Sequence, residues 1–200
     1  MGFPRNLVLA RILALAAVFP APLDSIDHRV ERELQSHRDS RLQGSMQAAT
    51  DLGRKDILFG LLLGIAVLDP IEGVATARLA VSSLVASGLV TEGLKRAVDR
   101  QRPDGEHRRS NSSFPSGHAT SAFALAVVFT RRWPRAGVPF WLLASAVAYS
   151  RLFLNRHYPS DVIAAALIGI VCAYLMCQWT WARTWGLGLG GAPRPSTRRP

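Results

Sequence analysis

A Pro-Ser-Gly turn ends in a histidine, His118, at the point where an apolar run begins. Pro115 and Gly117 interrupt regular structure and Ser116 is a candidate N-cap, so the pattern predicts a helix that starts here. The unpaired N–H groups and partial positive charge of a helix start favour a bound anion such as phosphate. His118 would lie beside that anion, although the same pattern also fits a helix start whose histidine has no chemical role.

A second segment, upstream of this turn, carries two cations seven residues apart, Lys95 and Arg102. On a helix, that spacing projects both side chains from the same face, two turns apart. Pro103 follows directly, so the sequence predicts a helix that ends at Arg102. The pair suits the binding of a phosphate group, but a solvated basic helix end has the same sequence.

The third segment holds an arginine, a histidine and an aspartate, Arg151, His157 and Asp161. Pro159 and Ser160 mark a helix start, where the Asp161 carboxylate would stabilise the positive end of the helix dipole. The carboxylate can instead hold the His157 imidazole in one tautomer and raise its basicity. The position of both residues in a polar turn before an apolar run favours the second interpretation.

The apolar runs around these segments predict the architecture. Runs without Asp, Glu, Lys or Arg cover residues 57–68, 79–91, 110–130, 136–150 and 162–182. The last run reaches the ~20 residues that cross a bilayer. We expect an all-α, membrane-embedded bundle of about five to six helices, with a compact soluble helical bundle as the alternative. Threading the runs up and down brings the three segments to one end of the bundle.

Length and composition set further limits. The chain of 200 residues is 48% hydrophobic yet carries a formal net charge of +10, almost all of it from arginine. The arginines form short clusters without zinc-finger spacing or interleaved aromatics, which favours a phosphorylated substrate or anionic lipid over nucleic acid. Cys172 and Cys177 lack metal-binding or redox spacing. We expect neither a metal nor a cofactor, because the chain has no Cys/His cage and no glycine-rich nucleotide loop.

Composition divides the chain into four parts. Residues 1–23 are predicted to form a signal-like segment or first membrane anchor. Residues 24–56 are polar and mixed in charge, which predicts an amphipathic segment. Residues 57–185 form the helical domain that carries the three segments, and residues 186–200 are expected to be a disordered tail. The basic cluster at residues 107–109 is either a solvated loop or a second anion contact.

Together, the three segments resemble the motifs of the type 2 phosphatidic acid phosphatase superfamily. That superfamily includes lipid phosphate phosphatases, bacterial acid phosphatases, glucose-6-phosphatase and vanadium haloperoxidases. The matching positions are Lys95 with Arg102-Pro103, then Pro115-Ser116-Gly117-His118, then Ser150-Arg151 with His157 and Asp161. The match covers residues 95–161 without a departure, and the order of the flanking apolar runs agrees.

The resemblance implies a role for each of these residues. His157 is implied as the nucleophile that forms a phosphohistidine, with Asp161 orienting it through its other ring nitrogen. His118 is implied as the acid that protonates the leaving oxygen and then activates water. The implied phosphate-binding groups are the side chains of Lys95, Arg102 and Arg151 and the backbone N–H groups around Ser116 and Gly117.

The resemblance therefore implies a metal-independent phosphatase for a phosphomonoester or diphosphate of a membrane lipid. Candidate substrates are phosphatidic acid, phosphatidylglycerol phosphate and polyprenyl phosphate or diphosphate. The alternatives are an acid phosphatase for soluble substrates, a vanadate-dependent haloperoxidase, and a non-enzymatic membrane transporter or phosphate-binding module. The last of these would need the cations but not the two histidines and the aspartate.

The resemblance and the export-like N-terminus also imply a location. They point to a multi-pass protein of the inner membrane with its active site on the outer, periplasmic face. The charge distribution gives no direction of its own, because lysine and arginine are nearly balanced between the two ends once Lys95, Arg102 and Arg151 are set aside.

Overall fold

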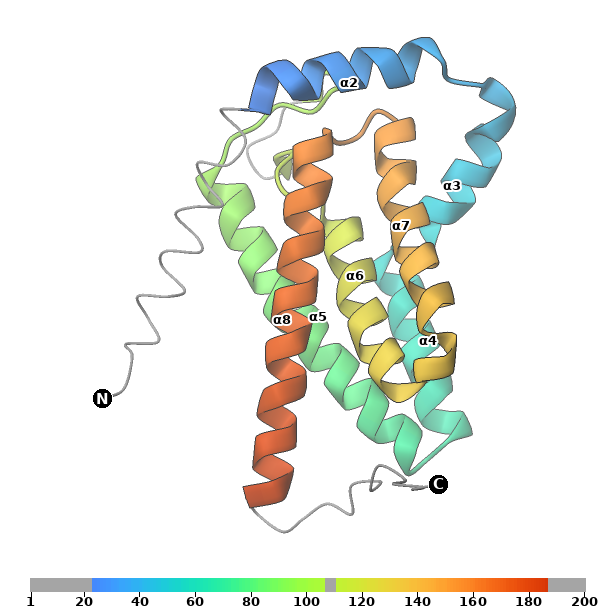
Figure 1. Cartoon of the computed structure of the whole chain (residues 1–200), viewed down its shortest axis with the longest axis vertical. Coiled ribbons are helices and arrows are strands. Elements are labelled where there is room, and N and C mark those ends of the chain that lie inside the picture. The colour runs from blue at the N-terminus through green and yellow to red at the C-terminus, as the bar shows by residue number, and fades with distance from the viewer. Residues whose placement is uncertain (1–22, 107–110, 187–200) are drawn as a thin grey trace, which may run out of the picture.

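A computed structural model describes residues 23–106 and 111–186 of the chain. Within these ranges the chain forms seven α-helices, two short 3-10 helices and no strand (Figure 1). The α-helices are α2 (Asp24–Ser36), α3 (Gln43–Asp51), α4 (Lys55–Leu68), α5 (Glu72–Ala97), α6 (Gly117–Arg132), α7 (Gly137–Phe153) and α8 (Pro159–Gly186). The 3-10 helices are η2 (Ser40–Leu42) and η4 (Pro134–Ala136).

Five of the helices, α4 to α8, form a bundle along the long axis of the molecule (Figure 1). α6 packs against α5, α7 and α8, and α4 packs against α5. α2 lies across one end of this bundle, and α3 leads from it down to α4. We call the segment formed by α2, η2 and α3, residues 24–51, the cap. The all-α bundle expected from the sequence is confirmed, with the cap added at one end.

A close approach between α6 and α8 fixes the end of the bundle beneath the cap. A Cβ added to Gly169 of α8 would lie 2.4 Å from the carbonyl oxygen of Thr120 and 3.0 Å from the backbone nitrogen of Ala124, both on α6. Only glycine fits there, because the opposing atoms are backbone and cannot turn away. Ala119 and Ala165 are fully buried in the same region. The first turns of α6 and α8 therefore lie side by side.

Three helical segments are long and apolar enough to cross a membrane: Glu72–Ala97, Pro134–Phe153 and Pro159–Trp179. Their outer faces expose large apolar side chains such as Leu89 and Leu142. Such faces are stable against lipid, whereas in water a soluble monomer rarely exposes so much contiguous apolar surface. The chain is a membrane protein, and the soluble bundle considered from the sequence is set aside.

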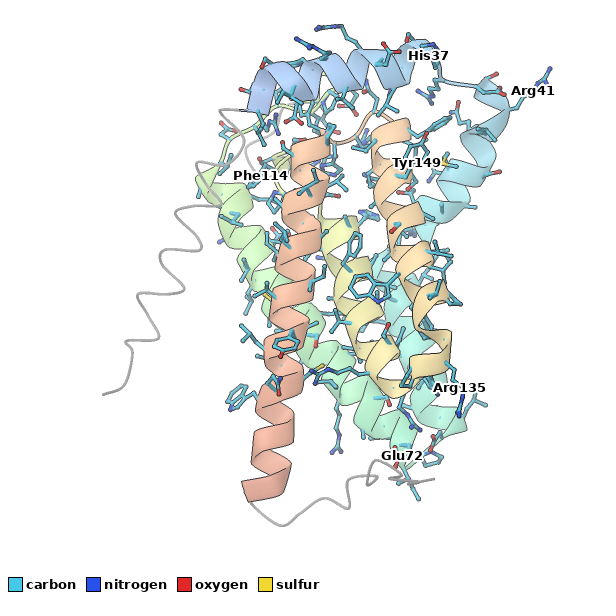
Figure 2. All side chains as sticks on the ribbon, in the orientation of Figure 1. His37, Arg41, Glu72, Phe114, Arg135 and Tyr149 are labelled. Carbon is cyan, nitrogen blue, oxygen red and sulfur yellow. The ribbon has the colours of Figure 1, made fainter. Side chains whose placement is uncertain are left out.

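The two ends of the bundle are polar. Figure 2 shows His37 and Arg41 on the cap, and Glu72 and Arg135 at the opposite end. At that opposite end Arg132 lies 3.5 Å from Glu72, which joins the end of α6 to the start of α5. The turn between α6 and α7 therefore lies away from the cap, as the up-and-down threading predicted.

Some predicted segments fall outside the described residues. The signal-like segment at 1–23 and the tail at 186–200 lie almost entirely there, as does the basic cluster at 107–109. The polar segment at 24–56 forms the cap and the start of α4. The division of the chain into four parts stays a prediction.

Candidate active site

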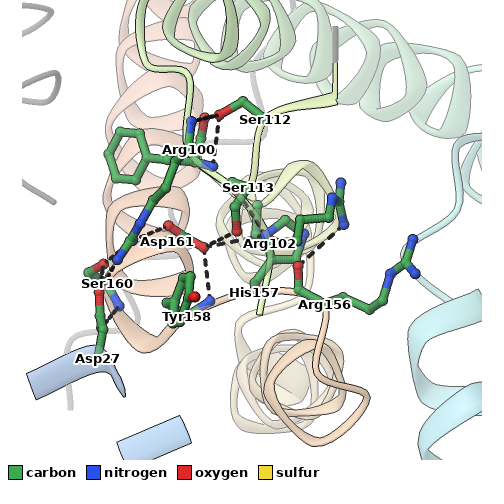
Figure 3. A network of polar contacts seen from close by, with 12 residues as sticks. Asp27, Arg100, Arg102, Ser112, Ser113, Arg156, His157, Tyr158, Ser160 and Asp161 are labelled. Atoms are coloured by element: carbon green, nitrogen blue, oxygen red, sulfur yellow. Dashed lines mark hydrogen bonds and ion pairs between the residues drawn. The ribbon is translucent and has the colours of Figure 1, made fainter. Parts of the chain in front are cut away.

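The three sequence segments meet at the end of the bundle that the cap covers. Figure 3 shows Arg102 of one segment beside His157 and Asp161 of another. The residues come from the last turn of α5 (Lys95), the loop after it (Arg102), the first turn of α6 (His118), the last turn of α7 (Arg151), the turn after α7 (His157) and the first turn of α8 (Asp161). The relative exposure of Lys95, Arg102, Arg151, His157 and Asp161 is 8%, 6%, 8%, 3% and 0%. Ionisable groups are this deeply buried only where they are paired or have a function.

The predicted end of the helix at Arg102 is wrong. α5 ends five residues before Arg102, which therefore lies in a loop and not on a helix face shared with Lys95. The chain becomes extended at Val98, and the Ser112 hydroxyl donates to the Val98 carbonyl oxygen at 2.5 Å. The Ser113 N–H donates to the Arg100 carbonyl oxygen at 2.8 Å. These long-range bonds replace the helical ones and end the helix before the proline does.

The three candidate phosphate-binding cations form no ion pair with a carboxylate in the described part of the chain. Their shortest hydrogen bonds go to uncharged acceptors: the Ser112 carbonyl oxygen at 2.6 Å from Lys95 Nζ, Asn111 Oδ1 at 2.7 Å from Arg102 Nη2, and Thr50 Oγ1 at 2.7 Å from Arg151 Nη1. Burial and the neighbouring Arg156 lower the pKa of Arg102. Converging buried cations without counter-ions attract an anion.

Among the buried polar atoms without a hydrogen-bond partner in the described ranges are Ser116 Oγ and the Nε of Arg151, one of the three cations. Ser116 occupies the N-cap position of α6, as predicted, but its hydroxyl does not bond to the helix. Its N–H donates to the Asp161 carbonyl oxygen at 3.2 Å, which corrects the prediction that this N–H binds phosphate. The Ser116 hydroxyl and the N–H of Gly117, the first residue of α6, are left as candidate donors. An unpaired buried hydroxyl costs about 1–3 kcal/mol, which an anion oxygen would offset.

The His157 imidazole is held by a backbone oxygen. Its Nδ1 lies 2.7 Å from the Ser113 carbonyl oxygen and 3.7 Å from Asp161 Oδ2. A carbonyl oxygen only accepts, so Nδ1 carries the proton and Nε2 carries the lone pair. Burial lowers the pKa of His157 to about 4, although the Asp161 carboxylate raises it, so the ring is neutral at pH 7. A neutral imidazole with a lone pair on Nε2 has the form that a nucleophile needs.

Asp161 supports the turn that holds the imidazole. Its Oδ2 accepts from the Ser113 hydroxyl at 2.5 Å and from the Tyr158 N–H at 2.8 Å. The resemblance implied that Asp161 orients His157 through its other ring nitrogen. Asp161 Oδ2 lies 3.7 Å from that nitrogen, Nδ1, and the Ser113 carbonyl oxygen makes the shorter contact at 2.7 Å. Asp161 acts on His157 through Ser113 and through its charge.

His118 lies against the turn between α3 and α4. A Cβ added to Gly53 in that turn would lie 3.1 Å from His118 Cδ2 and 2.8 Å from Val147 Cγ1, so this turn forms one wall of the site. Burial, with the guanidinium groups of Arg151 and Arg102, lowers the pKa of His118 to about 4. An anion bound to the two arginines would counter their charge and raise the His118 pKa.

The structure adds five residues that the sequence analysis missed: Asp27, Thr50, Gly53, Arg100 and Ser113. Figure 3 shows Arg100 between Asp27 and Asp161, with Ser113 on the other side of Asp161. Arg100 and Ser113 lie next to recognised motifs in the sequence, and this proximity is the feature that could have identified them. The basic cluster His107, Arg108 and Arg109 lies outside the described residues.

Known proteins resemble this chain in sequence and in fold. The lipid A 1-phosphatase of Rhizobium etli is 37% identical over 100 residues, which cover 44% of this chain and 43% of that protein. The chain therefore spans less than half the length of this curated relative. Among solved structures, Aquifex aeolicus LpxE is similar in fold, with a TM-score of 0.68 and 23% identity over 76% of this chain and 95% of that one.

A second solved structure has the same fold. It is the first transmembrane PAP2 type phosphatidylglycerolphosphate phosphatase from Bacillus subtilis, with a TM-score of 0.68 and 20% identity over 90% of this chain and 98% of that one. The family model of the PAP2 superfamily matches residues 76–185, which is more than half of the chain and includes all three motifs. The resemblance seen in the sequence is thereby confirmed, and the chain belongs to the PAP2 superfamily.

Proposed function

We propose that the chain is a metal-independent phosphatase that removes phosphate from a membrane lipid through a phosphohistidine intermediate. One observation carries the proposal: the buried, neutral His157 presents its Nε2 lone pair in the field of Arg102 and Arg151, which are close enough to lower its pKa. A nucleophile and a set of cations that can bind the phosphate are the two parts that phosphoryl transfer to a side chain requires.

In the first step, His157 Nε2 forms a bond to phosphorus while the bond from phosphorus to the leaving oxygen breaks. His118, protonated in the complex, gives its proton to that oxygen, and the lipid alcohol leaves. Lys95, Arg102 and Arg151 stabilise the charge on the non-bridging oxygens. Each preorganised donor of this type contributes a factor of about 10²–10³ to the rate.

In the second step, water attacks the phosphohistidine. His118, now neutral, takes a proton from the water as its oxygen bonds to phosphorus, and the bond from phosphorus to His157 Nε2 breaks. Inorganic phosphate leaves, His157 regains its lone pair, and His118 holds the proton for the next cycle. The same imidazole thus serves as acid and then as base.

A membrane lipid is the substrate class that the surroundings of the site favour. The site lies at one end of the helices that can cross a membrane, which is where a lipid headgroup would be found. An apolar groove of about 230 Å³, lined by Leu52, Ile57, Leu61 and further apolar residues of α4, α6 and α7, starts at the turn that contacts His118. It has the composition that an acyl or prenyl chain needs. The named activities of the relatives, on lipid A and phosphatidylglycerolphosphate, support the same class.

The test is a substrate panel with the purified full chain in detergent. Phosphatidic acid, phosphatidylglycerol phosphate, polyprenyl diphosphate and lipid A are compared with p-nitrophenyl phosphate as a soluble ester, with released phosphate as the readout. We expect one of the lipids to be preferred, EDTA to have no effect, and vanadate to inhibit as an oxyanion that resembles the transition state. Failure to hydrolyse any lipid, or a loss in EDTA that Mg²⁺ restores, contradicts the proposal.

We also propose that the protein lies in the inner membrane with the cap and the active site on the outer face. The export-like sequence of residues 1–23 supports this orientation, and the turn at 131–135, at the opposite end of the bundle from the cap, would then be cytoplasmic. Gln101→Cys and Arg135→Cys place single thiols at exposed positions of the two ends, in a variant without the two native cysteines. An impermeant thiol reagent should label position 101 in intact cells. Labelling of position 135 alone would reverse the orientation.

A further inference from the structure

The cap is attached to the bundle through a buried acid. Asp27 is the one buried residue of α2, with 1% exposure. Its Oδ1 accepts from the Ser160 N–H at 3.0 Å, and its Oδ2 accepts from Arg100 Nη2 at 2.7 Å and from the Ser160 hydroxyl. Asp24 also accepts from Arg100 Nη2, at 2.8 Å, and Gln35 donates to a backbone oxygen of α7 at 3.2 Å. Since its one fully buried side chain is a carboxylate, α2 docks largely through polar contacts, of which those of Asp27 are the most buried.

Arg100 continues this contact from the cap to the catalytic turn. Its Nη2 donates to Asp27, and its Nη1 donates to Asp161 Oδ1 at 2.6 Å and to the Ser160 hydroxyl at 2.8 Å (Figure 3). The guanidinium also lies over the ring of Tyr158, at 4.3 Å from its centroid. Both terminal nitrogens of the planar guanidinium donate hydrogen bonds, and a lysine ammonium cannot reproduce that arrangement.

From Asp161 the contacts lead to the imidazole. Asp161 Oδ2 accepts from the Ser113 hydroxyl at 2.5 Å, and the Ser113 carbonyl oxygen lies 2.7 Å from His157 Nδ1. Asp27 also binds the first turn of α8 directly, through the Ser160 N–H, and Asp161 is the next residue of that turn. Two routes therefore run from the cap to Asp161, and the contact through Ser113 leads from there to His157.

We propose that Asp27 is a positioning residue of the active site, which holds Asp161 in place through Arg100 and Ser160 and thereby directs His157 Nε2 toward phosphorus. The inference rests on the proposed phosphohistidine chemistry. It gives this one residue of the cap a role in the active site, although Asp27 lies outside residues 76–185 that the family model matches. Groups that act behind a reacting side chain in this way typically contribute about 10–100-fold to activity.

The test is Asp27→Asn, which keeps the shape of the side chain and removes its charge. The matched control is Glu33→Gln on the same helix, because Glu33 is exposed and its ion-pair partner is the exposed His37. The readouts are kcat and KM on the lipid that the wild type hydrolyses fastest, the rate of phosphohistidine formation after rapid mixing, and the melting temperature in detergent.

For Asp27→Asn we expect a 10–100-fold lower kcat and slower phosphohistidine formation. KM should stay within about threefold, because Asp27 contacts none of the phosphate-binding cations. Glu33→Gln should match the wild type. A purely structural role predicts a lower melting temperature with unchanged kcat per folded molecule, and that result would overturn the inference.

Arg100→Lys is the second variant, for the case in which Asp27→Asn does not fold. A lysine ammonium keeps the positive charge but cannot bind Asp27 and Asp161 at once as the guanidinium does. We expect a lower kcat with KM preserved, and a wild-type kcat in Arg100→Lys would also overturn the inference. A wild-type chain that forms no phosphohistidine contradicts the proposed function itself, so the two failures are distinguishable.

Discussion

The Nδ1 of His157 lies 2.7 Å from the carbonyl oxygen of Ser113, so the backbone selects the tautomer that leaves the lone pair on Nε2. The Asp161 carboxylate, at 3.7 Å from the same nitrogen, supports the ring from behind. In a serine-protease triad, by contrast, the aspartate itself fixes the histidine tautomer. Because the Ser113 carbonyl selects the tautomer and Asp161 only supports the ring, the effect of removing the Asp161 carboxylate can be predicted.

We expect Asp161→Asn to lower kcat by about 10–100-fold without abolishing turnover, because the Ser113 carbonyl still fixes the tautomer. The amide also loses the charge that faces Arg100, so the melting temperature in detergent should fall. Steady-state kinetics of the folded variant check the prediction. A loss as complete as that of His157→Ala would show that Asp161 has a direct chemical role.

The two histidines should differ in their dependence on the leaving group. His157→Ala should form no phosphoenzyme from any substrate, because the nucleophile is gone. His118→Ala should still form phosphohistidine from p-nitrophenyl phosphate, whose leaving group scarcely needs a proton. It should lose about 10²–10⁴-fold on an alkyl phosphate ester, and the intermediate should accumulate.

A pulse of radiolabelled substrate, followed by an assay for alkali-stable, acid-labile phosphoprotein, separates these cases. Label on His157→Ala but not on His118→Ala would mean that the nucleophile and the acid are reversed. A wild-type chain that shows no label even after rapid quenching would count against a covalent intermediate.

Anion binding should tighten as the pH falls. Burial and the two arginines lower the pKa of free His118 to about 4, and a bound anion raises it by countering Arg102 and Arg151. Between the two pKa values the complex binds more protons than the free protein, so affinity increases with acidity in that window. Sulfate is a suitable probe, since its own ionisation is constant there. Its competitive inhibition constant should decrease from pH 7 toward pH 5 in the wild type and change less in His118→Gln.

Gly53→Ala should disturb the position of the proposed acid, His118, more than that of the proposed nucleophile, His157. The new Cβ would lie 2.8 Å from Val147 Cγ1 and 3.1 Å from His118 Cδ2, so one of these side chains must move. We expect a lower kcat on alkyl phosphate esters, with phosphoenzyme formation from p-nitrophenyl phosphate retained. Gly44→Ala is the matched control, because nothing lies within 4 Å of its Cβ position. Equal activity of the two variants would show that His118 does not depend on this wall.

The sequence predicted the bundle and the convergence of the motifs because both depend on local signals. The apolar runs at 57–68 and 136–150 lie close to the bounds of α4 and α7, and their alternation determines which boundaries share an end. The predicted end of α5 was wrong because contacts between residues distant in sequence determine where this helix ends. Hydrogen bonds from Ser112 and Ser113 hold the extended chain after Val98, and a rule based on the following proline does not include them.

The contribution of the cap could not be predicted for the same reason. The hydrogen bond between Arg151 and Thr50 spans 101 residues of sequence, and that between Asp27 and Ser160 spans 133. Neither Thr50 nor Asp27 belongs to a motif, and in a polar, mixed-charge segment each resembles its solvated neighbours. Their roles became visible only when the fold brought the cap over the ends of α7 and α8.

The gathering of the candidate catalytic groups at one end of the bundle has a consequence for lipid traffic. Under the proposed function, the enzyme reaches headgroups in a single leaflet. A phosphorylated lipid made in the opposite leaflet stays intact until another protein moves it across, so its dephosphorylation in the cell depends on that translocation step. In sealed vesicles with every copy inserted the same way, hydrolysis should stop when the accessible leaflet is exhausted, and addition of a lipid scramblase should restart it.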